Sequence, residues 1–596
     1  MTEASDWLAR VRQFERRGEL LLAYDTALHG LEEHPYDVWL GHRAVLSLAK
    51  AGATGRAEAE FARLRLQASS EPDVVALGAR IAKDRALAAS EEERAALLSR
   101  AADRYEAIYR ASGGYYPGVN VATLRLLASE REAAERVARE VLTLCLDDNA
   151  ASDDAYYVAA SRAEASLVLG DAAAARIALQ SAAALSADLA ARATTRRQLR
   201  LVCTARGIAD DVLAPLAAPA VIHYTGHMIS AQGRDGCFPA RQEMQVAAGI
   251  RAMLGERNVG FGYGALASGA DILFAEALLE RGAELHVVLP FARDEFVEIS
   301  VDPAGPGWRE RFDACLARAT SVTFATDDRY LGHDWIFAYG SFVAMGLAVL
   351  RARFLDAAVR QIAVWDGEET TGSAGTGFDV RTWRELVGQA DVIRCGEGTR
   401  RAVSWTPVPP SRGRELRAML FGDVKGFSKL TEAQIPAFVT HLLGALGGVL
   451  ERYGDAVLYR NTWGDGLFVV MSDAAAAAQC ALDLQAAVAA VDLEAQGLPG
   501  TLALRLGGHF GPVFEARDPV QGVMNYFGAH VSRTARIEPV TPPGEVFVTE
   551  QFAARLALEP RGYACDYVGQ VPAAKSYGTL RMYHLHAPAR AQARRQ

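Results

Sequence analysis

The chain has 596 residues, which is too long for one hydrophobic core and predicts three or four domains. Half of the residues are apolar and 23% are charged, the balance of an ordinary globular protein. The formal net charge of −9 argues against a nucleic-acid-binding protein, because such proteins usually present a basic face.

Cysteine usage and apolar runs bear on the cellular compartment. The seven cysteines are scattered and form no CxxC pair, which predicts free thiols in a reducing compartment, with neither a disulfide framework nor a zinc site. The first 20 residues are charged throughout and lack a signal-peptide core. The longest uncharged apolar run, Ile336 to Leu350, is too short to span a bilayer. We therefore expect a cytoplasmic protein that binds neither membrane nor nucleic acid.

Residues 1–212 are rich in Ala, Leu, Arg and Glu and predict an α-helical domain. Segments 20–28 and 133–142 carry apolar residues at helical spacing, and Gly or Pro separates such segments, which indicates a helical-repeat array. Residues 19–66 resemble a degenerate tetratricopeptide repeat, and residues 105–127 resemble the TRAFs-binding region found upstream of some bacterial cyclases. Two interpretations stay open: a regulatory scaffold that binds a protein partner, and a helical spacer that aids dimerisation.

Residues 218–397 alternate short apolar strands with helices, which predicts an α/β domain with a doubly wound parallel sheet. The expected strands are 220–224, 259–263, 284–289, 321–325 and 361–365, and the expected helices are 242–254, 270–281, 307–319 and 336–354. Ligands of such sheets bind at the carboxyl ends of the strands. Those strand ends are therefore where a ligand site is expected.

Small residues stand at two of these strand ends: Gly226 follows the first strand, and residues 264–271 follow the second. Residues 264–271 lead from the second strand into a helix, and a glycine-bearing loop there offers N–H groups to a phosphate. The order of SGAD, ALLERGAELHVVLPF and VWDGEETTGSAGTGFD resembles the SLOG superfamily, Rossmann-like domains that bind nucleotide-derived ligands. The candidate contacts for such a regulatory ligand are Gly226, Ser268, Gly269 and Asp271. The alternative is that these residues only form tight turns.

Two loop histidines of this region, His227 and His333, are considered as catalytic groups. Neither has an identifiable partner in the sequence, so a solvated side chain is the simpler interpretation of each. The Pro-bearing residues 398–413 predict a linker, and the Arg-rich residues 588–596 predict a flexible tail.

Residues 414–587 predict an α+β domain with two aspartates at the ends of strands. Residues 417–424 alternate like a strand and reach Asp423, after which a glycine-bearing turn offers N–H groups suited to a triphosphate. A helix follows, and its expected apolar face is Val439, Leu442, Leu443, Leu446 and Leu450.

The second aspartate, Asp465, stands between glycines in a hairpin between strands 456–462 and 467–471. Two carboxylates on short turns can hold a hard divalent cation, since Mg2+ is usually bound by one or two carboxylates plus substrate phosphates. The remaining strands complete a βαββαβ-like order of the ferredoxin type. They are expected at 502–510, 544–549 and, as a strand pair, 575–585.

Five segments, LFGDVKGFSKL, NTWGDGLFVV, LGGHFGPVF, NYFGAHVSRTARIEP and GEVFVTEQFA, together resemble the class III nucleotidyl cyclase catalytic domain. The resemblance implies that Asp423 and Asp465, with the carbonyl of Val424, bind two Mg2+ or Mn2+ ions per active site. It implies that Arg536 stabilises the transition state, together with the residue at position 532. The implied substrate-binding residues are Gly426, Phe427, Ser428, Asn461, Asn525 and Lys575. It also implies a homodimer through the cyclase domain, in which each site combines residues of two chains.

Three positions depart from the family pattern. Asn461 and Asn525 stand where these cyclases carry base-reading residues, and asparagine offers donors and acceptors together. The usual family rule therefore does not fix the base: ATP is the leading substrate, while GTP or a pyrimidine nucleotide stays open. Ser532 stands where the family usually has an asparagine, and its shorter side chain bears on the reaction rate.

The leading hypothesis is a nucleotide cyclase that releases pyrophosphate and is regulated by its upstream domains in intracellular signal transduction. The second is a non-catalytic nucleotide sensor with a degenerate cyclase domain. A third makes the middle domain itself a nucleotide-processing enzyme.

Overall fold

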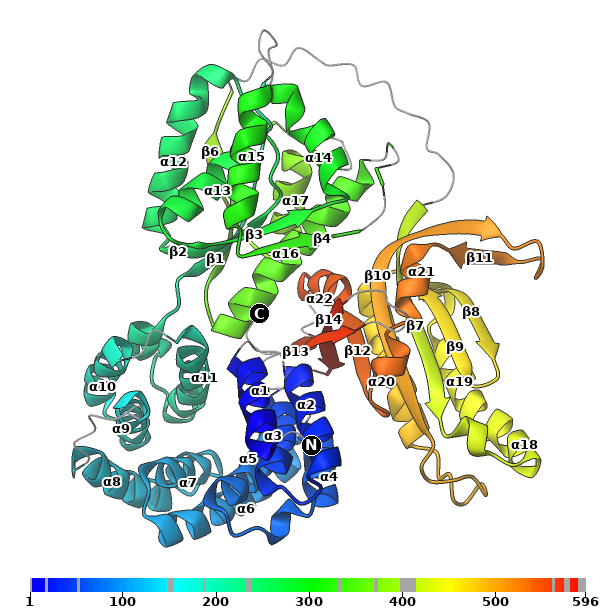
Figure 1. The fold of residues 1–596 in the computed structure, drawn as a ribbon. Helices are drawn as coiled ribbons and strands as arrows, with labels where there is room; N and C mark the ends of the chain where they lie inside the picture. The colour runs from blue at the N-terminus through cyan, green and yellow to red at the C-terminus, as the bar shows by residue number, and fades with distance from the viewer. Residues whose placement is uncertain are drawn as a thin grey trace.

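The structure is a computed structural model, and it describes residues 3–16, 20–50, 54–147, 155–185, 188–230, 237–326, 329–330, 332, 334–368, 374–396, 414–559, 563–572 and 579–587. Three regions follow one another along the chain (Figure 1): a helical array, a parallel sheet with helices, and a mixed sheet with helices. The predicted linker 398–413, the predicted tail 588–596, His333 and Lys575 lie outside the described residues.

The helical array confirms the predicted helical N-terminal region. Its helices are α1 (Ala4–Arg16), α2 (Leu20–Glu33), α3 (Val38–Lys50), α4 (Thr54–Arg63), α5 (Pro72–Ala88), α6 (Glu91–Ser112), α7 (Tyr115–Leu127), α8 (Arg131–Asp147), α9 (Ala155–Leu169), α10 (Ala172–Leu185) and α11 (Leu189–Arg206). From α1 to α10 each helix packs against the next, and α1 also contacts α3, α3 contacts α5, and α7 contacts α9. Contacts between neighbours and next neighbours are the packing of a helical-repeat array.

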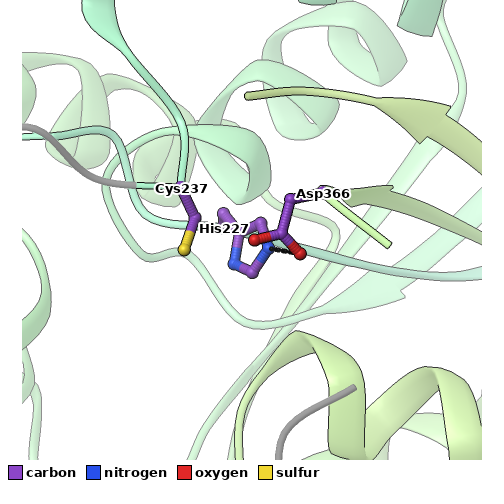
Figure 2. Close-up of side chains that lie close together, drawn as sticks. All are labelled: His227, Cys237 and Asp366. Atoms are coloured by element: carbon purple, nitrogen blue, oxygen red, sulfur yellow. Dashed lines mark ion pairs between the residues drawn. The ribbon is translucent and has the colours of Figure 1, made fainter. Parts of the chain in front are cut away.

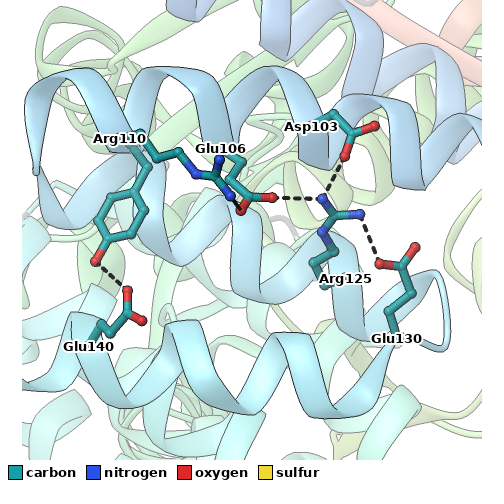
Figure 3. Close-up of polar contacts among 7 residues, drawn as sticks. Asp103, Glu106, Arg110, Arg125, Glu130 and Glu140 are labelled. Carbon is teal, nitrogen blue, oxygen red and sulfur yellow. Dashed lines mark hydrogen bonds and ion pairs between the residues drawn. The ribbon is translucent and has the colours of Figure 1, made fainter.

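One arginine ties α6, α7 and the start of α8 together (Figure 3). The guanidinium of Arg125 lies 2.5 Å from Asp103, 2.7 Å from Glu106 and 2.8 Å from Glu130, and its side chain is only 13% exposed. Burial opposes the charge, but hydrogen bonds to these carboxylates raise the pKa of Arg125 above its ordinary value. The ion pairs therefore fix three successive helices relative to one another.

The middle region has a six-stranded sheet in the order β4-β3-β2-β1-β5-β6, and the recorded pairings of its strands are parallel. Its strands are β1 (Ala220–Gly226), β2 (Val259–Gly264), β3 (Glu284–Leu289), β4 (Ser321–Phe324), β5 (Val359–Trp365) and β6 (Ala390–Arg394). Its helices are α12 (Glu243–Glu256), α13 (Ala270–Glu280), α14 (Arg293–Ser300), α15 (Pro306–Arg318), α16 (Trp335–Leu355) and α17 (Thr376–Leu386). The predicted strands and helices are confirmed to within a few residues.

Three elements of this region, β6, α14 and α17, were missing from the prediction. β6 is a partly exposed edge strand of five residues, so it lacks the buried apolar run that marks a central strand. α14 has only eight residues, and α17 begins directly after the Gly-rich stretch that reads as a turn. Each element is either too short or too close to a Gly-rich stretch to give a clear sequence pattern.

The C-terminal region has a sheet in the order β13-β14-β12-β10-β7-β9-β8, with β11 paired to β10. Its strands are β7 (Arg414–Lys425), β8 (Val457–Trp463), β9 (Gly466–Met471), β10 (Ala503–Arg517), β11 (Met524–Phe527), β12 (Val546–Thr549), β13 (Ala564–Pro572) and β14 (Thr579–His586). Its helices include α18 (Ile435–Ala437), α19 (Gly444–Arg452), α20 (Ala474–Ala489), α21 (Ala529–Thr534) and α22 (Glu550–Ala557). The hairpin at Asp465 is confirmed, whereas the predicted strand pair at 575–585 is wrong in extent, because its first strand already begins at Ala564.

The apolar face predicted for the helix after β7 is wrong in part. Val439 is 51% exposed, and Phe438 and Val449 are buried in its place. The reason is that residues Phe438–Leu443 form a π-helical turn between α18 and α19. A π turn adds a residue to the helical repeat and rotates the following face, so a strict 3.6-residue period chooses the wrong side chain.

Helix α16 joins the middle and C-terminal regions. A Cβ placed on Gly346 would lie 2.0 Å from the carbonyl oxygen of Ala554 in α22, so the two helices are in backbone contact. Tyr339 Oη of α16 donates a hydrogen bond to the carbonyl oxygen of Phe510 in β10 at 2.9 Å. One hydrophobic cluster contains buried residues of both regions, including Val343 and Leu420. The two sheets therefore share a core through α16.

Two described helices are long and apolar enough to cross a membrane by length and composition, Trp335–Leu355 and Glu432–Arg452. The prediction that the apolar run at Ile336 is too short was therefore wrong, since α16 extends past that run to Leu355 and reaches 21 residues. In the structure α16 is mostly buried, at 67% of its most apolar window, between the two sheets. In this structure α16 is thus a core helix.

Candidate active site

The predicted metal ligand Asp423 is paired with an arginine. Asp423 lies near the end of β7, opposite Arg505 of β10 in the antiparallel register. Arg505 Nε donates to Asp423 Oδ1 at 2.7 Å, and Arg505 Nη2 contacts the other carboxylate oxygen. Burial opposes ionisation, but the hydrogen bonds from Arg505 hold the pKa of Asp423 below its ordinary value. Asp423 is therefore a carboxylate at neutral pH.

A second acid, Glu538, shares the same arginine. Glu538 Oε1 lies 2.8 Å from Arg505 Nη2. Burial and then the neighbouring Asp423 raise the pKa of Glu538 to about 8. The negative charge of this pair of acids thus rests on Asp423, while Glu538 keeps its proton near neutrality.

Asp465 lies at the tip of the β8–β9 hairpin, where Trp463 pairs with Gly466 across a two-residue turn. The turn needs a positive φ at Gly464, which is 69°, and glycine adopts this conformation without strain. Burial and then the charge of Asp423 raise the pKa of Asp465. The register pairs Gly422 of β7 with Leu467 of β9, so Asp423 and Asp465, which stand just beyond this pair, lie at the same end of the sheet.

This donor set fits a hard divalent cation. Two negatively charged carboxylates repel each other, and a cation bound between them removes this repulsion. Mg2+ or Mn2+ prefers such oxygen ligands. Arg505 now supplies part of the balancing positive charge. Sequence reasoning missed Arg505 and Glu538, although Glu538 stands in a segment that resembles a cyclase motif and Arg505 directly precedes another. The signal that could have found Arg505 is its pairing position opposite Asp423.

The glycine-bearing turn after β7 is formed as predicted, with Gly426 at a φ of 96°. Phe427 packs on Phe438 at a ring-centroid distance of 4.8 Å, so this side chain supports the turn from the core side. Ser428 is exposed and Val424 is buried. The turn is therefore held in place by an aromatic contact and presents its serine to solvent.

The implied base-reading and transition-state residues lie on three further elements. Asn461 is half-buried on β8, and Asn525 lies on β11, where its amide donates to Asp518 at 3.2 Å and accepts from the backbone N–H of Tyr526 at 2.7 Å. Ser532 is exposed on α21. Arg536, just after α21, has a buried Nε without a hydrogen-bond partner in the part of the chain that the structure describes. An unsatisfied buried donor is costly, which favours an acceptor supplied by a ligand or by another chain.

In the middle region the four predicted ligand contacts surround the start of α13. Ser268 and Asp271 are buried, and Asp271 accepts a hydrogen bond from the N–H of Ala267 at 3.2 Å. Gly269 has a φ of 100°, and a Cβ there would lie 2.3 Å from the backbone of Ile229. Gly226 is as crowded, because its Cβ would meet that of Ala270 at 2.3 Å. The turn interpretation of these residues thus has direct support, and ligand contact stays a prediction.

The buried acid Asp271 has a perturbed pKa. Burial raises the pKa of Asp271 to about 7, and the charge of Asp379 adds to the shift. Asp379 is also buried and accepts from Thr225 Oγ1 at 2.7 Å. Two acids therefore lie under the carboxyl edge of the parallel sheet.

Comparison with known proteins identifies two regions of the chain. Residues 412–587 match the family model described as the adenylate and guanylate cyclase catalytic domain. The C-terminal region thus carries a cyclase-type domain. Residues 20–125 match the family model TPR-S, described as Tetratricopeptide Repeats-Sensor. The predicted cyclase and tetratricopeptide resemblances are thereby confirmed at the level of these regions.

Individual relatives match only part of this chain. A protein of Rhizobium meliloti (strain 1021) named "Putative adenylate cyclase 3" is 31% identical over 142 residues, which are 23% of this chain and 22% of that protein. The aligned part of this chain thus covers about a fifth of the length of that relative.

Solved cyclase structures also align with less than a third of this chain, although nearly all of each solved chain is covered. The adenylyl cyclase CyaB from P. aeruginosa has 19% identity and a TM-score of 0.27, covering 29% of this chain and 95% of that one. The guanylyl cyclase Cya2 has 21% identity and a TM-score of 0.25, covering 30% of this chain and 95% of that one. At these values the structural likeness carries no functional argument.

Proposed function

We propose that this protein is a metal-dependent nucleotide cyclase that converts a nucleoside triphosphate, with ATP as the leading candidate, to the 3′,5′-cyclic nucleotide and pyrophosphate. The observation that carries the proposal is the pair Asp423 and Asp465, which the β7–β9 register and the β8–β9 hairpin bring to the same end of the sheet. The match of residues 412–587 to the cyclase family model supports the same reaction.

In this proposal Asp423 and Asp465, with the carbonyl of Val424, hold two Mg2+ or Mn2+ ions. When bound, these ions lower the pKa of the ribose 3′-hydroxyl and neutralise the pyrophosphate that leaves. Arg505 donates to Asp423 and fixes its orientation toward the site. Arg536 donates to the α-phosphate as its charge grows, and Lys575 binds the triphosphate.

The working unit is a homodimer whose sites combine residues of both chains. Its support in the structure is the arm formed by β10 and β11, which exposes several large apolar side chains. These are Phe514, Val523, Met524 and Phe527, exposed by 37%, 50%, 49% and 40%. In a dimer this arm would be covered, and the unpaired Nε of Arg536 would find the substrate bound by the aspartates of the other chain.

The upstream regions regulate the cyclase in this proposal. We propose that the middle region is a SLOG-like, doubly wound domain that binds a nucleotide-like ligand, and that the helical array binds a protein partner. We further propose that the C-terminal domain has a ferredoxin-like fold. The proposed site of action is the cytoplasm. The support for coupling is that α16 of the middle region is in backbone contact with α22 of the cyclase region.

A non-catalytic nucleotide sensor is the second candidate, and one observation favours it. The amide of Asn525 is engaged by Asp518 and by the backbone of its own strand, so it is not free to read a base without rearrangement. A cyclase that uses GTP or a pyrimidine nucleotide is the other alternative, since asparagine at both base-reading positions selects neither purine.

The test is to incubate the purified chain with ATP, GTP, CTP or UTP and Mn2+ and to identify products by mass spectrometry. The expected result is one cyclic nucleotide and pyrophosphate, with a rate that falls by about 100-fold or more in Asp465→Ala, since metal ligation is worth several kcal/mol. Asp455→Ala is the matched control, because Asp455 is exposed just before the other end of β8. A lack of cyclic product with all four nucleotides, or activity that survives Asp465→Ala, would overturn the proposal.

A further inference from the structure

Three side chains with metal-binding atoms converge in the middle region (Figure 2). They are His227, Cys237 and Asp366, and one ligand atom of each lies within 4.8 Å of the others. His227 Nε2 is 3.1 Å from Asp366 Oδ1. The residues come from separate segments: His227 directly follows β1, Cys237 lies further along the same connection, and Asp366 directly follows β5.

The cluster stands where sheets of this kind open a crevice. β1 pairs with β2 on one side and with β5 on the other, so the order of the strands reverses between β1 and β5. Ligands of open parallel sheets bind outside the carboxyl ends of the strands at such a reversal. The side chains of His227 and Asp366 are 15% and 5% exposed, so the cluster is sheltered but not sealed.

The donor chemistry selects a class of metal. Imidazole nitrogen, thiolate sulfur and carboxylate oxygen are the ligands of Zn2+, whereas Mg2+ and Ca2+ take oxygen almost throughout. Bonds of about 2.0–2.3 Å in a tetrahedron put neighbouring ligand atoms about 3.3–3.8 Å apart. The observed 3.1 Å between nitrogen and oxygen and the upper limit of 4.8 Å for the cluster bracket that spacing.

Surrounding contacts hold the ligand-bearing segments in position. Asp366 Oδ1 accepts a hydrogen bond from the N–H of Glu368 at 3.0 Å, and the carbonyl of Asp366 accepts one from Arg394 at 2.8 Å. A Cβ on Gly396, whose φ is 80°, would lie 2.8 Å from the carbonyl oxygen of Cys237. The segment after β6 thus packs directly on the backbone that carries the thiol. Fixed outer contacts of this kind orient metal ligands and raise their affinity.

We propose that His227, Cys237 and Asp366 bind one zinc-class divalent transition metal ion and leave its fourth position to water or a small ligand. Three protein ligands with one open position distinguish such a site from a closed structural one. Cysteine binds as the thiolate, so its proton is released to solvent when the metal binds. The inference stands independently of catalysis by the cyclase region.

Cobalt tests the site because a Co2+–thiolate bond absorbs in the near ultraviolet and carboxylate-bound Co2+ does not. The full chain is stripped with a chelator, desalted and titrated with Co2+, and Zn2+ is then added as a competitor. We expect one thiolate-bound cobalt per chain, displaced by Zn2+. The band should persist in Asp465→Ala, which separates this site from that of the cyclase region. No thiolate band in folded wild-type protein would overturn the proposal.

Variants assign the ligands. Cys237→Ser should lose the band, and His227→Gln and Asp366→Asn should weaken Co2+ binding by at least about tenfold, since loss of even an outer partner costs 10- to 100-fold. Cys315→Ala is the matched control, because Cys315 is buried in α15 of the same region and lies outside the cluster. Cys395→Ser should keep the band as well. A band that survives Cys237→Ser, or that depends on Cys395 instead, would overturn the assignment.

A stability readout guards against variants that fail to fold. Zn2+ binds only the folded site, so it should raise the unfolding temperature of the wild type and of Cys315→Ala. The same addition should leave the unfolding temperature of Cys237→Ser unchanged. Equal stabilisation of all three would contradict a site at Cys237.

Discussion

Gly346 is the point at which the contact between α16 and α22 can be broken with one methyl group. In Gly346→Ala the new Cβ would lie 2.0 Å from the carbonyl oxygen and 2.5 Å from the Cα of Ala554. An ordinary contact starts near 3.4 Å, so the two helices must separate locally by the difference, about 1.4 Å. Because both atoms at the contact belong to backbone, no side-chain rotation can relieve the overlap.

The expected change in free energy has two opposing parts. Glycine to alanine in a helix stabilises by about 0.8–1.0 kcal/mol, whereas overpacking of a tight core costs about 1–3 kcal/mol. Since the overlap at Gly346 is with backbone, we take the upper part of that range and expect a net loss of about 1–2 kcal/mol. For regions of this size the unfolding temperature should fall by roughly 2–8 °C.

Gly448→Ala supplies the matched control. Gly448 lies in α19 of the cyclase region and has nothing within 4 Å of an added Cβ, so only the helix-propensity gain applies. Calorimetry of the full chain should therefore show opposite shifts for the two variants. If the cyclase is coupled to the middle region through α16, its rate should change in Gly346→Ala and stay at the wild-type value in Gly448→Ala. A rise in unfolding temperature in both variants would refute the reasoning.

Three further predictions follow from buried polar groups. Thr326→Val removes a hydroxyl that bonds a buried histidine at 3.0 Å, and should lower the free energy of unfolding by about 1–3 kcal/mol in denaturant titration, unlike the control Thr323→Val on the more exposed β4. Arg125→Met leaves Asp103 and Glu130 without their cation and Glu106 with Arg110 alone, and should cost about 1–3 kcal/mol, against nearly none for the exposed Arg104→Met, by thermal unfolding. Burial raises the pKa of Asp271 to about 7, so the folded state binds more protons than the unfolded state between about pH 4 and 7. The stability of the middle region should therefore fall as the pH rises through that window. Asp271→Asn should flatten the slope of unfolding temperature against pH. Equal values in either matched pair, or an unchanged slope, would contradict the corresponding argument.

Much of the fold was accessible from the sequence because its strands are short, apolar and bounded by Gly, Pro or Asp. The two aspartates of the candidate site were predictable for the same reason, since each follows a recognisable strand. The pairing of Arg505 with Asp423 was not, because it depends on the register between strands 82 positions apart in the chain. The prediction that Val439 lies on the buried helix face failed for a local reason. A π turn interrupts the helical period, and a 3.6-residue template does not detect it in the sequence.

The metal cluster shows a different limit. His227 looked like a solvated loop histidine because its partners are distant: Asp366 lies after β5, and Cys237 follows a stretch with no metal-binding spacing. The expectation of no zinc site rested on the lack of a CxxC pair, which detects ligands only when they share one turn. Ligands from separate strand ends meet only once the order of the strands is known, and the adjacency of β1 and β5 is a property of the folded sheet.

The position of the cluster also bears on how a ligand there could reach the cyclase region. Thr326 follows β4, so it lies at the same carboxyl edge of the parallel sheet as His227 and Asp366, three strand spacings or about 14 Å along from β1. Thr326 Oγ1 bonds His530 of α21 at 3.0 Å, and His530 in turn bonds His509 of β10 at 2.7 Å.

This short chain of hydrogen bonds stays uncharged across the physiological range. Burial holds the pKa of His509 and of His530 well below the ordinary value, so both rings are neutral, and each donates one proton and accepts another. His530 lies on the buried side of α21, and Ser532 lies on its exposed side, four residues before Arg536. Through His530, Thr326 therefore contacts the helix that carries Ser532 and leads to Arg536.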